Sequence, residues 1–537
     1  GIMLGGYWAY GVLGWGGWWG WDPVENSSLI PLIVGIALVH TLLVQKKSGG
    51  FMRTNFTLAV LAYVLVVHST FLTRSGILGS ASVHSFTDPG TMVYTLLLVW
   101  VISLAVIGLG LLARRWTDLK PTAVATGILR KDSMLGWTAV VLGLLAFVVF
   151  VGTNWPIVSD ASVEPSFYNK TAVPIGILLA VLLGFSLALQ WEELPWSVAF
   201  KRMLFPIIGA AVVTAGVFFF GVRDILPLVF TLVSVFALFM SIRVAVAMFR
   251  VDLLTTGGPV AHIGLAILFL GIIGSGFYSE QQTVSLPQGE EVAVLGYHLT
   301  YSGAQPTPDG KYVMTVAARH GETRFTTNPV MFRSEYNNSI MRNPDYVSFL
   351  TKDFYVEPVS LEAPQRSSHG STAQVVKGKT AEVAGYTVTF ERFEMQPHDA
   401  ANSPQGSMTI GAVLTVKKGK QVWTLTPISV FANGEVQKAT GISLEAGTEL
   451  RLVGMNIDMT GAGSNITLEA TTPGAALGMK PETLVVEASV KPFIALVWIG
   501  SLFCFIGAGI ALVRRRTEGR PDAAEARTER AREAVTV

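Results

Sequence analysis

Cysteine is almost absent from this sequence of 537 residues, which contains only Cys504, within an apolar run. A single cysteine excludes a disulfide framework within the chain, and no Cys-x-x-Cys-His motif is present, so the chain is not itself a c-type cytochrome. Charged residues are also scarce, at 14% of the sequence, compared with about 25% in an ordinary soluble domain. The net charge of +2 comes without a basic domain, which leaves no indication of nucleic-acid binding.

The shortage of charge is uneven along the chain. Residues 1–278 and 493–513 consist mostly of apolar runs, whereas residues 279–490 have the composition of ordinary soluble protein. The sequence therefore predicts a membrane part and a water-exposed part. The predicted parts are a transmembrane region at 1–278, a β-rich domain at 279–490, a final transmembrane helix at 491–513 and a basic tail at 514–537.

Membrane-spanning helices require about 20 consecutive, mostly apolar residues. Nine segments meet this requirement, at residues 29–45, 55–73, 91–113, 134–152, 172–190, 203–221, 225–247, 258–277 and 493–513. Residues 1–13 read as the end of one more span, and the chain begins at Gly1 within an apolar stretch, without an initiator methionine. We therefore expect the protein's own N-terminus to lie upstream of this sequence.

The short loops between these spans differ in basic residues, and the difference predicts an orientation. One alternate set of loops contains eleven Lys and Arg residues, whereas the other set contains three. Cytoplasmic loops are the richer in Lys and Arg, so the set with eleven is expected to face the cytoplasm. The arginines that start at Arg514, after the last span, fall on the same side. Residues 15–26, the loop with His84 and residues 279–490 are then expected on the outer face.

Residues 283–490 alternate polar and apolar side chains between turn signals, as in 291–300 and 386–391. This period-two pattern indicates antiparallel sheet, and a domain of about 200 residues can bury its own core. The predicted fold class is therefore a polytopic α-helical membrane protein with nine complete transmembrane helices, an N-terminal remnant and an inserted β-rich extracytoplasmic domain, either a barrel or a sandwich. The histidines of this domain lack metal-ligand spacing and are expected at its solvated surface. They are His298, His320, His369 and His398.

Five tryptophans fall within fourteen residues near the N-terminus, with glycines between them. We call residues 15–26 the tryptophan segment, and two interpretations of it stay open. Tryptophan is enriched at membrane interfaces, so the segment could be an interfacial aromatic belt. Alternatively, the glycines leave the backbone bare, so that a large planar ligand could approach it closely. Asp22 before Pro23 predicts a helix N-cap, with Glu25 at the capping-box position.

Two histidines lie inside predicted spans, and an ionisable side chain there suggests a functional site. His40 is five residues from the cytoplasmic end of its span, and His262 is four residues past the cytoplasmic start of another. At about 1.5 Å per residue, both lie roughly 6–8 Å inside the cytoplasmic boundary. Two imidazoles at one depth on different helices can ligate one haem iron from opposite faces. The alternative is that each histidine is hydrogen-bonded to different neighbours.

Further candidates lie near the outer face. His84 follows the 55–73 span and shares the outer side with the tryptophan segment, and Arg74 at the same level could pair a haem propionate. The alternatives are an exposed loop histidine and an arginine that extends to the membrane interface. His68, in the outer half of the same span, is expected to be a packed polar residue.

These residues together carry a resemblance to a known family. Trp15-Gly-Gly-Trp-Trp-Gly-Trp-Asp-Pro-Val-Glu-Asn26 resembles the tryptophan-rich WWD signature of haem-handling proteins. The continuation through His40, residues 71–76 and the His84 loop is similar to CcmF, the haem lyase family of system I cytochrome c maturation. Residues 258–264, before a β domain and one last span, fit the same family.

The resemblance implies a role for each candidate position. His40 and His262 would be the axial ligands of a resident haem b, and His84 would be one of two outer histidines that bind incoming substrate haem. The second outer histidine would lie upstream of the signature, outside this sequence. The candidates around the substrate haem are Trp15, Trp18, Trp19, Trp21, Asp22 and Arg74. Gly20 and Leu32 depart from the family pattern, which often has an aromatic residue and a tryptophan there, and Gly20 cannot stack on haem.

The resemblance also implies a haem lyase, or holocytochrome c synthetase, that works in a multi-subunit complex of the bacterial cytoplasmic (inner) membrane. Haem would come from the haem chaperone CcmE, and a CcmH-type thioredoxin-like subunit would help present reduced apocytochrome c. The thiols of its Cys-x-x-Cys-His motif would form two thioethers with the haem vinyl groups. Quinol is a possible source of an electron through the haem b.

Other functions stay open on the sequence. The related CcmC is shorter and lacks a large outer β domain, and the system II synthetase fits this domain order less well. A nitrite-reductase-specific paralogue of the lyase shares the same features. A haem exporter or haem-delivery transporter is expected to contain inverted repeats with broken spans, and the sequence contains no such repeat. An assembly scaffold would bind no haem.

Overall fold

A computed structural model describes most of the chain between residues 1 and 518. The positions it does not describe are 13–16, 80, 83, 87, 121, 123–126, 128, 160, 162, 335–339, 368–369, 396–407, 420, 433–434, 445–447, 457–463, 472–477 and 519–537. The chain forms two compact units. Unit 1 comprises Gly1–Ser360 and Leu484–Val537, and unit 2 comprises Leu361–Thr483.

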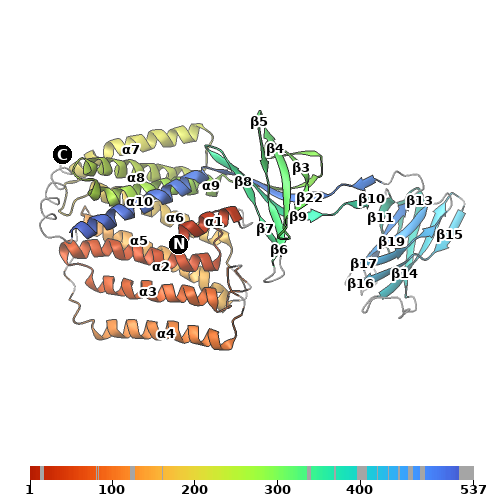
Figure 1. The fold of residues 1–537 in the computed structure, drawn as a ribbon, viewed down its shortest axis with the longest axis horizontal. Helices are drawn as coiled ribbons and strands as arrows, with labels where there is room; N and C mark the ends of the chain where they lie inside the picture. The colour runs from red at the N-terminus through yellow and green to blue at the C-terminus, as the bar shows by residue number, and fades with distance from the viewer. Residues whose placement is uncertain are drawn as a thin grey trace. The chain divides into compact units, whose positions relative to one another are not determined.

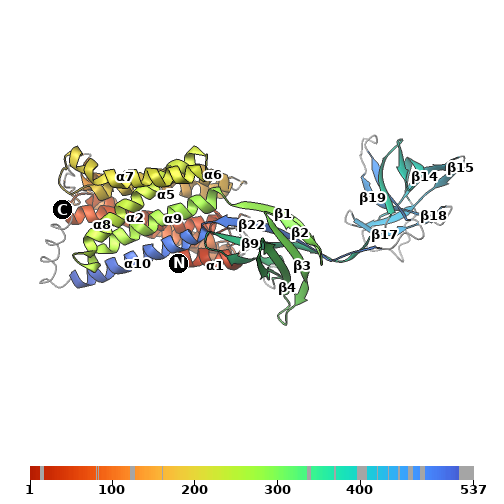
Figure 2. The same cartoon turned by 90° about the horizontal axis from the view of Figure 1, so that it is seen from above.

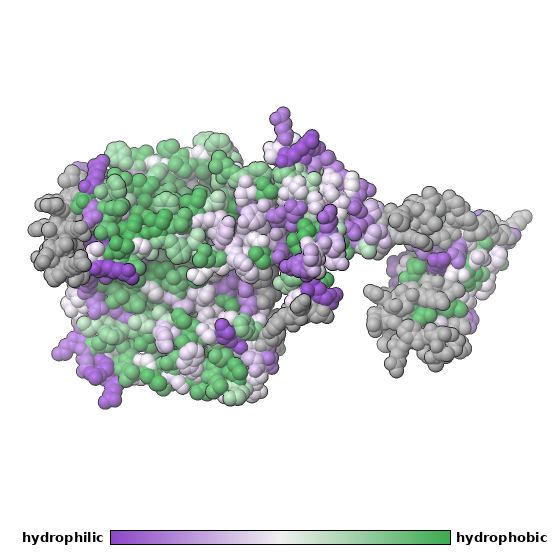
Figure 3. All heavy atoms as spheres, in the orientation of Figure 1, coloured by the Kyte–Doolittle hydropathy of each residue, from purple (hydrophilic) through white to green (hydrophobic). Residues whose placement is uncertain are grey.

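Unit 1 contains the membrane helices. Among the described residues, nine helices are long and apolar enough to cross a membrane, which confirms the nine predicted spans. They are α2 (Pro23–Ser48), α3 (Met52–Arg74), α4 (Thr91–Arg114), α5 (Lys131–Val158), α6 (Pro165–Ala188), α7 (Trp196–Phe219), α8 (Ile225–Phe249), α9 (Gly257–Phe277) and α10 (Ile494–Glu518). Their outward surface is strongly apolar (Figure 3), as lipid contact requires. The chain is therefore a multi-pass membrane protein.

Two helices begin earlier than the hydropathy of the sequence indicates. The structure starts α6 at Pro165 and α7 at Trp196, whereas the predicted spans start at 172 and 203. Proline is favoured in the first turn of a helix because its fixed φ suits the helix and its missing N–H is not needed there. The first turns of both helices are polar or mixed in composition, so hydropathy alone does not detect them.

One half of the bundle is organised around α2, which lies between α3 and α5 (Figure 1). Its buried face includes Ile30, Ile33 and Ala37, which pack with Leu142 and Val149 of α5. By contrast, α4 buries none of its residues and has α3 as its main neighbour. An apolar helix with no buried side chain is stable in this position only if lipid or another membrane helix covers it.

The other half contains α9 and α10, which lie side by side in both views (Figures 1 and 2). Their backbones touch at glycines. A Cβ atom added at Gly264 would lie 2.5 Å from the backbone N of Cys504 and 2.5 Å from the backbone O of Gly500. Small residues allow such close approach of membrane helices. The Cys504 thiol also donates to the Ala261 carbonyl at 3.4 Å, so α10 directly supports the start of α9.

Two sheets follow the bundle within unit 1. The first has the strand order β1-β22-β9-β8, and the second has the order β2-β3-β4-β6-β7, with β5 paired to β4. The strands are β1 (Glu280–Pro287), β2 (Glu291–Val294), β3 (Tyr297–Pro306), β4 (Tyr312–His320), β5 (Thr323–Thr327), β6 (Val330–Arg333), β7 (Ile340–Asn343), β8 (Asp345–Ser348), β9 (Lys352–Glu362) and β22 (Thr483–Pro492). Buried aromatic residues such as Tyr297 and Phe354, whose ring centres are 4.0 Å apart, join the two sheets.

Unit 2 is a β-sandwich. One sheet has the order β12-β13-β14-β16-β17 with β15 on β14, the other has the order β11-β20-β19-β18, and β10 pairs with β21. Val388, Phe390 and Leu414 of the first sheet share one buried core with Leu452 and Leu468 of the second. The strands are β10 (Gln365–Ser367), β11 (Gly370–Val376), β12 (Thr380–Val383), β13 (Tyr386–Met395), β14 (Met408–Lys418), β15 (Gln421–Leu425), β16 (Ile428–Ala432), β17 (Glu435–Thr440), β18 (Ile442–Ser443), β19 (Glu449–Asn456), β20 (Asn465–Thr471) and β21 (Gly478–Lys480).

The β-rich segment 279–490, predicted as one domain, is thus divided between the two units. Its first strands and its last strand belong with the membrane helices, and the sandwich between them has its own core. Alternating polar and apolar residues identify strands but do not reveal which strands share a core.

A short helix, α1 (Ile2–Val12), connects the bundle to the first sheet of unit 1. Tyr10 is fully buried, and its hydroxyl donates to the Asp353 carboxylate of β9 at 2.8 Å. The Tyr10 ring also packs against Tyr346, Tyr355 and Trp498. This buried contact anchors α1, which precedes the tryptophan segment in the chain, to the first sheet.

Buried charges lie next to this contact. Glu357 of β9 and Lys491 of β22 are 6% and 4% exposed, and the Lys491 ammonium lies 5.2 Å from the centre of the Tyr355 ring. Burial raises the pKa of Glu357 to about 7 and lowers the pKa of Lys491 to about 8. The attraction between the buried Lys491 ammonium and nearby buried carboxylates offsets part of the desolvation free energy of these charged groups.

Candidate functional site

The tryptophan segment ends at a capped helix. Asp22 is the N-cap of α2, and its Oδ1 accepts from the Val24 N–H at 2.8 Å, as the sequence predicts. Glu25 reaches back to accept from the Gly20 N–H at 3.1 Å, so the end of the segment is tied to the first turn of α2. Asp22 satisfies backbone donors that a helix start leaves unpaired, whereas Glu25 binds the N–H of a residue that precedes the N-cap.

The tryptophan side chains occupy different environments. Trp21 has a positive φ of 54°, and its ring stacks on Tyr168 with centres 4.8 Å apart and an interplanar angle of 7°. Its Nε1–H donates to Asn169 at 2.9 Å. Trp19 lies perpendicular to Trp21, with ring centres 6.1 Å apart. Trp21 is therefore covered on one face by Tyr168, and it also packs against the apolar cluster that α2 forms with α5.

Trp18 and Trp19 are also partly buried. Trp18 packs against the cluster formed by Tyr10, Tyr355 and Trp498. The buried Nε1–H of Trp19 has no hydrogen-bond partner among the described residues, and a buried donor of this kind costs free energy until an acceptor reaches it. Trp15 lies outside the described residues.

The predicted outer histidine lies against the tryptophan segment. His84 Nδ1 is 3.3 Å from Asp22 Oδ1, and the same oxygen accepts from the Ser82 hydroxyl at 2.7 Å. A carboxylate close to Nδ1 favours a proton on that nitrogen, which leaves Nε2 able to bind a metal. Asp22 therefore contacts two elements at once, because it caps α2 and lies against His84.

Arg74, at the end of α3, points to the same loop. Its guanidinium lies 4.9 Å from the centre of the Phe86 ring, and the Phe86 N–H donates to the Thr73 carbonyl at 2.9 Å. The loop after α3 is thereby folded back on the helix end. The structure brings His84 to Asp22 and holds Arg74 on the flank of the same loop.

The two histidines predicted at one depth are neighbours. The ring centres of His40 on α2 and His262 on α9 are 6.3 Å apart, with an interplanar angle of 19°. His40 Nδ1 lies 2.8 Å from the Ile36 carbonyl, so it donates there and leaves Nε2 as an acceptor. His262 Nδ1 is buried without a hydrogen-bond partner among the described residues. The pair thus offers the Nε2 atom of His40, which is half-buried, and the buried Nδ1 atom of His262.

The other histidines have ordinary environments. His68 packs between Phe71 and Phe150, with ring centres 6.5 and 5.5 Å away. His298 pairs with Glu291 at 2.9 Å, and His320 contacts the Gly296 carbonyl at 2.9 Å. His369 and His398 lie outside the described residues. In the part of the chain that the structure describes, no group of three or more His, Cys, Asp or Glu side chains forms a metal site.

Sequence reasoning missed several residues of this site. Tyr168 and Asn169 come from the start of α6 and hold Trp21, and Ser82 shares Asp22 with His84. A buried tyrosine at a membrane interface is a common anchor, so only the aromatic content of α6 could have suggested Tyr168. Nothing in the spacing links Asn169 or Ser82 to a segment so distant in the sequence.

Comparisons with known proteins agree on one group of relatives. The family described as cytochrome C assembly protein matches residues 1–78. A cytochrome c-type biogenesis protein CcmF of Pseudomonas aeruginosa is 32% identical over 383 residues, which cover 66% of this chain and 57% of that protein. CcmF of Escherichia coli is 32% identical over 326 residues, or 56% of this chain and 48% of that protein. NrfE of Haemophilus influenzae, also a cytochrome c-type biogenesis protein, is 30% identical over 315 residues, or 56% and 48%.

A solved structure shares the fold. The structure titled "Cytochrome c Heme Lyase CcmF" superposes with a TM-score of 0.58 at 20% identity, covering 95% of this chain and 63% of that one. The chain spans about half the length of the sequence relatives it matches.

Proposed function

We propose that this chain, which belongs to the CcmF family of cytochrome c-type biogenesis proteins, is a haem lyase subunit that attaches substrate haem to the Cys-x-x-Cys-His motif of apocytochrome c. One observation carries the proposal. A single carboxylate, Asp22, joins the tryptophan segment to His84, at 3.3 Å from its Nδ1. This arrangement combines aromatic surface for a porphyrin with a metal-binding nitrogen held in one tautomer.

The substrate haem is proposed to lie against the tryptophan segment with its iron bound by His84. The rings of Trp19 and Trp21 would contact the edge of the porphyrin, and the unpartnered Nε1–H of Trp19 would meet an acceptor there. Trp15 and Trp18 belong to the same segment. Arg74 is proposed to pair a propionate, for which its guanidinium is suited.

A resident haem b is proposed between His40 and His262. The fit rests on the buried Nδ1 of His262 that lacks a hydrogen bond and on the separation of 6.3 Å between the two ring centres. His40 and His262 would hold this haem through their imidazole nitrogens. Such a haem supplies electron transfer, for which quinol is the proposed donor.

In this proposal the residues of the chain orient the substrate haem and form no covalent bond with it. Asp22 keeps the Nδ1–H of His84 in place, so that Nε2 faces the substrate iron, and the aromatic rings exclude water from one porphyrin face. Each cysteine S–H of the apocytochrome then adds across one haem vinyl group, with sulfur bonded to the inner carbon and the proton transferred to the outer carbon. The histidine of the apocytochrome motif replaces the lyase ligand, which releases the product.

The proposed setting is the bacterial cytoplasmic membrane, with the tryptophan segment and both β regions on the outer, periplasmic side. The loop charges support this orientation. The proposed partners are the haem chaperone CcmE, a CcmH-type thioredoxin-like subunit and apocytochrome c. Reduced thiols are required because only a free S–H adds to a vinyl group.

Complementation tests the proposed function. A bacterial strain that lacks its own lyase is expected to regain haem-stained c-type cytochromes when it produces this protein, and His84→Ala is expected to reduce the stain to below about a tenth. His320→Gln, a change at a histidine of the β region, serves as the control and should behave like wild type. Membranes that contain the protein and bind haem, yet form no c-type cytochrome, would contradict the lyase and favour a transporter. Protein that binds no haem at all would indicate a scaffold.

Asp22 offers a second test that addresses haem binding alone. Asp22→Ala removes the cap of α2, which costs about 1 kcal/mol, and removes the partner of His84, so haem affinity should fall about 10- to 100-fold. Titration of the purified protein with ferric haem, followed by absorbance, measures the change. Asp88→Ala is the matched control, since Asp88 Oδ1 accepts from the Gly90 N–H in the same loop region. Equal affinities for wild type and Asp22→Ala would exclude the role given to Asp22.

A further inference from the structure

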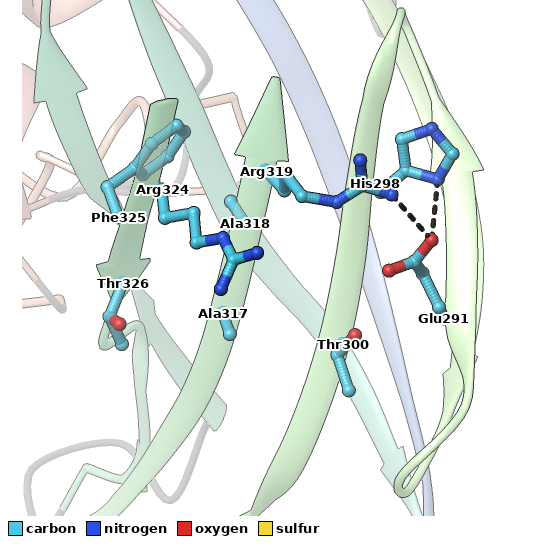
Figure 4. Close-up of a pocket in the computed structure, with 9 residues that line it drawn as sticks. All are labelled: Glu291, His298, Thr300, Ala317, Ala318, Arg319, Arg324, Phe325 and Thr326. Atoms are coloured by element: carbon cyan, nitrogen blue, oxygen red, sulfur yellow. Dashed lines mark hydrogen bonds and ion pairs between the residues drawn. The ribbon is translucent and has the colours of Figure 1, made fainter. Parts of the chain in front are cut away.

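A row of basic side chains crosses the second sheet of unit 1 (Figure 4). In the strand register, His298 of β3 lies opposite Arg319 of β4, and Arg319 lies opposite Arg324 of β5. Residues directly opposite each other on antiparallel strands project from the same face of a sheet. Three side chains that can carry positive charge therefore stand side by side on one face.

Like charges in directly opposed positions are destabilising in a sheet. Glu291 neutralises one end of this row, because its Oε1 lies 2.9 Å from His298 Nδ1 and 3.1 Å from the Arg319 guanidinium. Arg324 stands at the other end, is exposed, and has no carboxylate partner among the described residues. The fold thus keeps two arginines adjacent, and a single carboxylate contacts the histidine and the nearer arginine.

The row borders a hollow. The next register row on the same face contains Thr300, Ala317 and Thr326. This row forms the floor of the hollow, and the small side chain of Ala317 leaves space above it. The hollow has a volume of about 430 Å³ and is lined by both rows together with Glu291, Ala318 and Phe325. Figure 4 shows the Arg319 and Arg324 side chains along it, with hydroxyls of Thr300 and Thr326 nearby.

We propose that this groove docks an acidic segment of a partner polypeptide, with side-chain carboxylates paired to Arg324 and Arg319. Glu291 shows that the row accepts a carboxylate, and the planar guanidinium matches a carboxylate with two parallel hydrogen bonds. The hydroxyls on the floor provide further donors. This inference goes beyond the proposed lyase function and does not depend on haem, since no residue of the groove belongs to the tryptophan segment or to the histidine pair.

Binding of a fluorescein-labelled hexaglutamate peptide to the purified full-length protein in detergent tests the proposal by fluorescence anisotropy. Wild type is expected to bind hexaglutamate, and not hexaserine. Arg324→Gln should weaken binding about three- to fivefold, as for one exposed ion pair, and Arg324→Glu should weaken it about tenfold or more through repulsion. Binding should also decrease as salt is raised.

The controls separate this groove from general positive charge. Lys417→Gln removes an exposed cation of unit 2 and should leave hexaglutamate affinity unchanged. Inorganic phosphate is then added as a competitor, and sodium chloride at the same ionic strength serves as the control. A groove for carboxylates should lose hexaglutamate equally in both salts, whereas a phosphate site should lose it more readily in phosphate. Hexaglutamate affinity that is the same in wild type and Arg324→Glu would overturn the proposal, as would selective displacement by phosphate. Neither result would affect the haem experiments.

Discussion

The His262→Ala variant is expected to lose the b-type haem absorption that we propose for the purified wild-type protein, and His40→Ala is expected to do the same. Each change removes one of two imidazoles whose ring centres are 6.3 Å apart on α2 and α9. The remaining histidine cannot bind the iron from both faces, so haem retained through purification should fall at least tenfold, by analogy with weakened metal sites. A reduced-minus-oxidised absorption spectrum, normalised to protein concentration, measures the loss.

The environments of the His40 and His262 nitrogens explain why we expect the loss of haem from these two variants in particular. His40 Nδ1 is engaged by the Ile36 carbonyl one turn earlier on α2 at 2.8 Å, which orients the ring and presents Nε2. The Nδ1 atom of His262 is buried and lacks a partner among the described residues. A neutral imidazole nitrogen without a hydrogen bond is costly in a buried site unless something else binds it.

A third membrane histidine supplies the control. His68→Ala alters α3, where the ring packs between Phe71 and Phe150, and should leave the b-type spectrum intact. If His40→Ala and His262→Ala retain the wild-type spectrum while folding normally, the ligand assignment is wrong. If His84→Ala removes the same absorption, the two proposed haem sites are not separate.

Much of this arrangement could be predicted from the sequence, for identifiable physical reasons. Hydropathy predicted nine spans because each must bury about 20 residues in lipid. Counting residues from the span ends gave His40 and His262 a common depth, since helices rise by a fixed distance per residue. The N-cap at Asp22 was predicted because its side chain and the following Pro23 suit only the start of a helix.

What the sequence could not provide depends on contacts between distant segments. The stacking of Trp21 on Tyr168 joins the tryptophan segment to α6, and the hydrogen bond from Tyr10 to Asp353 joins α1 to a strand residue 343 positions away. Residue types suggest that such aromatic rings have partners, but they do not name them. For the same reason, alternating residues predicted strands in 279–490 without indicating that the strands divide between two cores.

The close contact of α9 and α10 leads to the second large effect, which is expected from Gly264→Leu. The new Cβ would lie 2.5 Å from backbone atoms of Cys504 and Gly500, so α10 must move away from α9. Overpacking lowers the free energy of unfolding by about 1–3 kcal/mol when neighbouring side chains can move aside. Here the new side chain meets backbone atoms, so we expect a cost at the upper end of that range or above it. Because His262 lies two residues from the altered position, we expect loss of the proposed b-type haem together with looser helix packing.

The single cysteine of the chain allows the packing of α9 against α10 to be measured independently of haem content. Cys504 faces α9, where its thiol donates to the Ala261 carbonyl, so in wild type a maleimide reagent should label it slowly. Gly264→Leu should be labelled several times faster and should lose haem in the same preparation. Gly276→Leu on the same helix is the matched control, because a Cβ there meets no atom within 4 Å. Slow labelling and full haem content in Gly264→Leu would mean that the two helices are not held by their glycines.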